Sequence, residues 1–105
     1  MTAEEFRQLA LSFPGAEESS HMGHPDFRVK GKIFATLNGD LTEGMAKLTP
    51  DQQADLMTRY PAAFRPASGK WGSSGATMIT LALATPDPTG EALTLAHQNI
   101  SSKPS

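Results

Sequence analysis

The sequence contains no cysteine, so disulfide frameworks, thiolate nucleophiles and zinc sites with cysteine ligands are excluded. No apolar run approaches the roughly 20 residues that a membrane-spanning helix needs. The first residues, Met-Thr-Ala-Glu-Glu, are acidic where a secretory signal would be basic and then apolar. These absences predict a cytoplasmic protein that has no membrane segment.

The length and composition indicate one ordinary folded domain. A chain of 105 residues has room for one domain with one hydrophobic core. The apolar fraction of 38% and the charged fraction of 19% are typical of globular proteins and exclude a disordered chain. We expect a single domain over residues 1–100, a frayed tail over residues 101–105, and a monomer.

The charge is small and unevenly spread along the chain. The net charge is −2 with a pI near 5.8, and this balance argues against a general binder of polyanions. Residues 27–70, however, carry seven basic side chains against four acidic ones, whereas residues 1–26 carry one against five. Any basic face must therefore be built from the middle of the chain.

The chain opens with a predicted helix. Thr2 and Glu5 have the capping-box spacing, in which a hydroxyl and a carboxylate each satisfy a free backbone N–H. Apolar residues then recur at helical spacing, at Phe6, Leu9, Ala10 and Phe13. Pro14-Gly15 ends this helix. We expect residues 17–20 to form a solvated connection.

The next segment has the alternation of strands. Residues 27–29 and 32–37 are predicted strands, joined by the two-residue turn Lys30-Gly31, in which glycine supplies a positive φ. A third strand is predicted over residues 44–48.

The turn also predicts the register of this strand pair. Phe27 should lie opposite Phe34 on one face of the pair, and Arg28 should lie opposite Ile33 on the other. The first face is then apolar and suited to a core.

The second half of the chain mixes helix and strand signals. Thr49-Pro50 opens a second helix. Residues 61–75 are irregular and surround the only tryptophan, Trp71; a loop this long usually contains a short strand or serves a function. Residues 77–84 are predicted to form a strand, and a last helix follows Pro88.

The predicted order of elements is α-β-β-β-α-β-β-α, and no internal repeat is found. Short, hairpin-type links between strands favour an antiparallel sheet with helices packed on one face. The sequence therefore predicts the α+β class.

Few residues could carry catalysis or hold a metal ion. His21, His24 and Asp26 form the only cluster that resembles metal ligands, but zinc needs three or four convergent ligands, so a turn or surface role is favoured. Residues 69–75 resemble a phosphate loop, but Trp71 stands where that loop needs serine or threonine. We predict no catalytic residue, metal or cofactor; an enzyme would have to use the two histidines and Asp26.

The remaining signal is basic. Arg28, Lys30 and Lys32 crowd one hairpin. Neighbouring elements add four further candidates, which are Lys47, Arg65, Lys70 and Trp71. Lysine and arginine contact phosphates, and an aromatic side chain beside them can stack on a base. These seven residues are the predicted nucleic-acid site, with weak DNA binding, although charges at a hairpin tip can also serve as solvated edge protection.

The loop around Trp71 supports a second hypothesis. Tryptophan and arginine are enriched at binding centres, so an exposed Trp71 with Phe64 and Pro66 would favour a protein-interaction or small-ligand surface. A buried Trp71 would be structural, and burial in the core is the expectation from sequence.

The order and spacing of several segments resemble the MmcQ/YjbR-like family of small bacterial proteins. The resemblance covers nearly the whole chain and rests on Ser12-Phe13-Pro14-Gly15-Ala16-Glu17-Glu18, Gly23-His24-Pro25-Asp26-Phe27-Arg28-Val29, Gly31-Lys32-Ile33-Phe34-Ala35, Lys47-Leu48-Thr49-Pro50 with Gln52-Gln53, Phe64-Arg65-Pro66, Trp71-Gly72 and Gly75. It implies a curved antiparallel sheet with flanking helices, similar to secretion-chaperone-like or frataxin-like folds. It also implies a "double wing" shape suggestive of DNA binding, although a fold does not fix a function.

Overall fold

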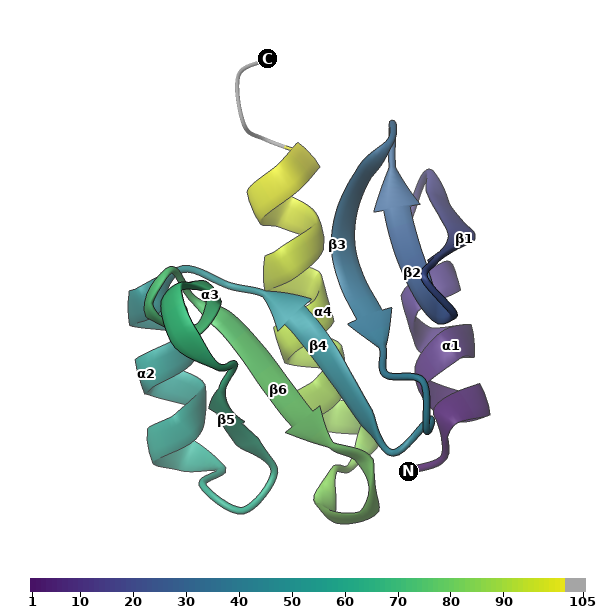
Figure 1. The fold of residues 1–105 in the computed structure, drawn as a ribbon. Coiled ribbons are helices and arrows are strands. Elements are labelled where there is room, and N and C mark those ends of the chain that lie inside the picture. Colours follow the sequence, from purple (N-terminus) through teal and green to yellow (C-terminus); the bar gives the residue numbers. More distant parts are fainter. Residues whose placement is uncertain (102–105) are drawn as a thin grey trace.

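A six-stranded antiparallel sheet organises the chain (Figure 1), and the computed structural model describes residues 1–101. The elements in chain order are α1 (Ala3–Leu11), β1 (Ala16–His21), β2 (His24–Val29), β3 (Lys32–Leu37), β4 (Glu43–Lys47), α2 (Pro50–Arg59), β5 (Phe64–Pro66), α3 (Gly69–Ser73), β6 (Ala76–Thr80), a 3₁₀ turn (Leu81–Leu83) and α4 (Pro86–Ser101). The strand order is β1-β2-β3-β4-β6-β5, and each neighbouring pair is antiparallel. The predicted α+β class is confirmed.

Strand β1 corrects the expectation that residues 17–20 form a solvated connection. Met22 and Gly23 both have positive φ, 53° and 81°, which is the geometry of a two-residue hairpin turn. The turn folds β1 back along the whole of β2. The strand has no apolar alternation, because it lies at the sheet edge with nearly all its side chains exposed. The position of β1 therefore depends on its backbone pairing with β2 and not on the burial of apolar side chains.

Other elements also differ from the prediction. The irregular segment 61–75 contains the short strand β5 and the helix α3. The strand predicted over residues 77–84 ends at Thr80, where the chain turns into 3₁₀ geometry. Helix α4 begins at Pro86, because proline is tolerated in the first turn, and it includes Ser101. The rest of the predicted frayed tail, residues 102–105, lies outside the described residues.

A β-bulge alters the register predicted for β2 and β3. Arg28 does lie opposite Ile33, but Phe27 lies opposite Ala35 and not opposite Phe34. Phe34 is thus the extra residue of a bulge. Phe34 and Ala35, although consecutive, are both fully buried, and Phe34 packs edge-on against the rings of Phe13 and His97.

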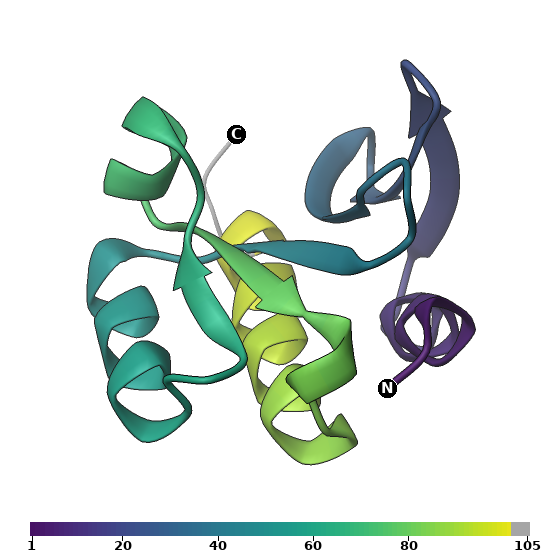
Figure 2. The same cartoon turned by 60° about the horizontal axis from the view of Figure 1, so that its bottom comes forward.

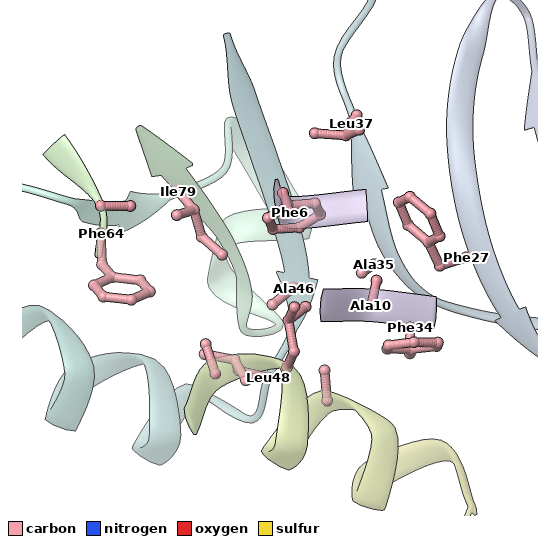
Figure 3. Packing of buried hydrophobic residues seen from close by; sticks show 14 of the residues in the cluster. Phe6, Ala10, Phe27, Phe34, Ala35, Leu37, Ala46, Leu48, Phe64 and Ile79 are labelled. Carbon is pink, nitrogen blue, oxygen red and sulfur yellow. The ribbon is translucent and has the colours of Figure 1, made fainter. Parts of the chain in front are cut away.

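Helices α1, α2 and α4 cover one face of the sheet, which is strongly twisted (Figure 2). The core lies between these helices and the strands, as Figure 3 shows. Its principal side chains are Phe6, Ala10, Phe27, Phe34, Ala35, Leu37, Ala46, Leu48, Phe64 and Ile79. The opposite face of the sheet carries charged side chains such as Arg28 and Arg65 together with Met45 and Met78.

The packing of α1 on the central strand gives a first test. Gly44→Ala would place a Cβ 2.6 Å from two ring carbons of the buried Phe6, so it is expected to destabilise the fold by about 1–3 kcal/mol. Gly90→Ala in α4 is the control, because its Cβ would meet no atom within 4 Å; it is expected to stabilise by about 0.5–1 kcal/mol. Chemical denaturation measures both, and equal stabilities would contradict this packing.

Candidate binding site at one end of the sheet

Antiparallel pairing brings four lysines to one end of the sheet. Lys32 begins β3 and Lys47 ends β4, so the antiparallel pairing of these strands places both at the same end. Lys30 lies in the turn before β3, and Lys70 lies in α3, shortly before Ala76, which pairs with Lys47. Figure 1 shows the end of β4 and helix α3 close together at mid-height on the left, whereas the β2–β3 turn lies apart from them at the upper right. We call Lys30, Lys32, Lys47 and Lys70 the lysine end.

The lysine end is not neutralised by acidic side chains. All four lysines are exposed, and every salt bridge among residues 1–101 uses an arginine. The Nζ atom of Lys47 lies 5.8 Å from the centre of the Trp71 ring, within the range of a cation–π contact. The positive charge is therefore available to an anionic ligand.

The two arginines of the predicted site form salt bridges with acidic residues and do not belong to the lysine end. Arg28 donates from Nε and Nη2 to the two oxygens of Asp26, at 2.7 and 3.0 Å; these hydrogen bonds raise the pKa of the Arg28 guanidinium. Arg65 forms a salt bridge with Glu43. Alternation along the strands places both pairs on the sheet face that the helices do not cover. Of the seven predicted residues, the fold gathers Lys47, Lys70 and Trp71 around one groove. Lys30 and Lys32 lie towards the same end of the sheet, at the β2–β3 turn.

Trp71 is 63% exposed, so the expectation that it is buried in the core is wrong. Its helix, α3, has five residues and follows the short edge strand β5 at the end of the sheet. The ring lines a groove of about 590 Å³, bounded by α3, the start of α2 and the end of α4. Lys47 and Lys70 also line it, together with the apolar residues Leu48, Pro50, Ala76 and Ile100.

Close backbone contacts and one glutamine fix the position of Trp71. A Cβ on Gly72 would lie 1.9 Å from the carbonyl oxygen of Ala67, and a Cβ on Gly75, whose φ is +113°, would lie 2.0 Å from that of Leu48. Only glycine permits these approaches. Gln53 of α2 donates from Nε2 to the carbonyl oxygens of Gly72 and Ala76 and to Oγ1 of Thr77, at 3.0–3.1 Å. We call Gln53, Gly72 and Gly75 the α3 clamp.

Sequence reasoning did not assign a role to Gln53. The available signal was the Gln52-Gln53 pair within the family resemblance. Gln52 caps α2 by accepting from the Thr49 backbone N–H, whereas Gln53 reaches across to α3. No periodicity or spacing distinguishes the two roles, because the partners of Gln53 lie 19–24 residues away along the chain.

The histidine cluster is arranged differently from a metal site. His21 and His24 face each other across the β1–β2 turn, while the Asp26 carboxylate is held by Arg28. Within residues 1–101 no group of three His, Asp or Glu side chains is placed to hold a metal ion. In the same range, no helix combines the length and apolar character needed to cross a membrane.

A solved structure shares this fold. The crystal structure of Deinococcus radiodurans protein DR2400, which has the family-model domain DUF419, matches with a TM-score of 0.80 over 97% of this chain and 80% of that chain. The sequence identity is 19%, so the likeness defines the α+β fold alone. No curated protein matches the sequence.

The family follows from the sequence match. The YjbR family model matches residues 11–99, and the chain therefore belongs to the YjbR family. The resemblance deduced from the sequence motifs is confirmed. The matched range includes the whole lysine end, Trp71 and the α3 clamp.

The α3 clamp gives a second test. Gln53→Ala would remove three hydrogen bonds that tie α2 to α3 and β6, although the Gly72 and Ala76 carbonyls keep a backbone donor. A loss of about 1 kcal/mol of stability is expected, with a more mobile Trp71. Trp71 fluorescence anisotropy and quenching by acrylamide measure the mobility directly, because the chain has one tryptophan. Gln8→Ala is the control, since Gln8 donates only to the exposed Glu4. Unchanged anisotropy in Gln53→Ala would show that the clamp does not hold the ring.

The Arg65–Glu43 pair gives a third test. The hydrogen bond from Arg65 lowers the pKa of Glu43 below its usual value, so the pair stabilises the fold above the pKa of an unfolded glutamate. That stabilisation is lost as the pH falls through the lowered pKa of the folded state. Arg65→Gln is expected to raise the Glu43 pKa towards 4.5, as measured by NMR titration of the side-chain carboxyl. An unaltered pKa would mean that Arg65 is free, as the sequence-based site required.

Proposed function

We propose that this domain binds nucleic acid weakly through the lysine end, without catalysing a reaction and without a cofactor. The observation that carries the proposal is that four exposed lysines, none with a salt bridge inside the described chain, lie towards one end of the sheet. Two of them, Lys47 and Lys70, line a groove with an exposed tryptophan. Ammonium groups contact phosphates, and aromatic rings stack on bases. The sequence-based predictions of a monomer and of a cytoplasmic location are part of this proposal.

The arginines of the chain are all paired with acidic side chains, and this supports the choice of the lysine end as the binding surface. Arg7 is paired with Glu4 and Glu18, and Arg59 is paired with Asp55 and Glu91. Together with the pairs of Arg28 and Arg65, these bridges neutralise the arginines. The basic excess of the middle of the chain is therefore concentrated in lysines.

Acidic residues nearby limit the affinity. Asp51 lies in the first turn of α2, beside the groove, and Glu17 lies opposite Arg28 at the same end of the sheet. The net charge of the chain is −2, so long-range attraction of a polyanion is small. Binding at low salt that weakens steeply with added salt is the behaviour to expect.

Exposure of Trp71 also favours the alternative of a protein-interaction or small-ligand surface. Large exposed aromatic residues are enriched at binding centres, and the groove has apolar walls. Phe64 does not belong to this surface, because it is 2% exposed and lies in the core. The alternative surface is then the Trp71 groove, and it would bind without dependence on Lys32, which does not line the groove.

Binding of labelled oligonucleotides, followed by fluorescence anisotropy, tests the proposal. Four phosphate contacts correspond to a slope of about −3 to −4 in log affinity against log salt on duplex DNA. The variant Lys32→Gln/Lys70→Gln is expected to reduce the slope to about −2. Its matched control is Arg7→Gln/Arg65→Gln, which also lowers the net charge by two and removes only paired arginines; this variant should keep the wild-type slope.

Two results would contradict the proposal. One is the absence of binding at low salt by the wild-type domain. The other is an equal loss in the lysine and arginine variants, because the effect would then reflect net charge and not the lysine end.

A further inference from the structure

The Trp71 groove combines features that match one nucleotide of a strand. Its volume of about 590 Å³ falls within the range of small-ligand sites. One wall is the exposed indole ring, and the Lys47 ammonium lies 5.8 Å from the centre of that ring. The groove therefore holds an aromatic ring with a cation over it, the two groups that would contact the base and the phosphate of a nucleotide.

We propose that this groove takes a single unpaired nucleotide, so that the lysine end prefers single-stranded to duplex nucleic acid. This inference rests on the proposed function and names its ligand class. Bases in a duplex are stacked on both faces, and a tryptophan inside a groove reaches a base face only after that base has been unstacked, which costs free energy. A single strand offers its base faces freely, and stacking on an aromatic ring is tolerant of sequence.

The rigidity of α3 strengthens the inference. Gly72 and Gly75 pack directly on backbone carbonyls, and Gln53 ties α3 to α2 and β6. The backbone that carries the ring is thus held at the groove before a ligand arrives, so that only the Trp71 side chain remains to be ordered on binding. An exposed tryptophan on a fixed backbone is suited to stacking.

The polar side chains of the groove leave little capacity to read base edges. The Asn99 amide donates to the carbonyl oxygen of Lys47 and to Oε1 of Gln52, at 3.1 and 2.8 Å. The Thr49 hydroxyl accepts from the Gln52 backbone N–H. The Ser74 hydroxyl also lines the groove. With the Asn99 amide occupied, recognition falls mainly to the ring, the two lysines and two hydroxyls, and weak sequence preference follows.

Three ligands of equal length separate stacking from charge: oligo(dT), an abasic strand with the same phosphates, and a blunt duplex. The readouts are anisotropy of the labelled ligand and quenching of Trp71 fluorescence. Oligo(dT) is expected to quench Trp71 and to bind roughly tenfold to a hundredfold more tightly than the abasic strand. The duplex is expected to bind without quenching Trp71.

Variants at Trp71 complete the test. Trp71→Leu is expected to bind oligo(dT) and the abasic strand equally, whereas Trp71→Phe should keep a preference for oligo(dT). Because the side chain is exposed, both variants should fold, and circular dichroism checks this.

The outcomes distinguish the two proposals. If the wild-type domain binds none of the three ligands, the proposed function fails and this inference fails with it. If it binds the duplex or the abasic strand as tightly as oligo(dT), or if Trp71 is not quenched, only this inference is overturned, and the lysine end remains a phosphate-binding surface.

Discussion

Strand β4 is paired on both sides, with β3 and with β6, and the position of every candidate residue depends on this pairing. The antiparallel contact with β3 places Lys32 and Lys47 at one end. The antiparallel contact with β6 brings α3, and therefore Lys70 and Trp71, to that same end. Helix α1 packs closely on this strand, and a glycine at position 44 leaves the room that Phe6 needs.

The two kinds of basic residue are used differently in this fold. Arg28 donates hydrogen bonds from two nitrogens to the carboxylate of the buried Asp26. The planar, forked guanidinium has the geometry for this double contact. Lysine carries a compact charge on a flexible stem, and the four lysines extend from turns, strand ends and a short helix. Counting basic residues along the sequence cannot make this distinction, because it depends on which carboxylate each side chain meets in the fold.

Much of the fold could be predicted from local patterns, and less of the site. The capping box of α1, the start of α2 at Thr49-Pro50, the Lys30-Gly31 turn and the Arg28–Ile33 pairing follow from local residues and spacing, and the structure has all of them. Strand β1 has no apolar alternation, and the bulge at Phe34 is a matter of packing, so neither leaves a local signal. The hydrogen bonds from Gln53 to Gly72 and Ala76, and the exposure of Trp71, depend on contacts between residues that are distant in sequence. They can be seen only in the folded structure.

The most direct test of the lysine end is a map of amide chemical shifts in the ¹⁵N-labelled domain as a short oligonucleotide is added at low salt. Residues 30–32, 47–49 and 70–74 should shift together and return to their free positions as salt is raised. Shifts centred on Arg28, Arg65 and the uncovered face of the sheet, or no shifts at all, would contradict the account.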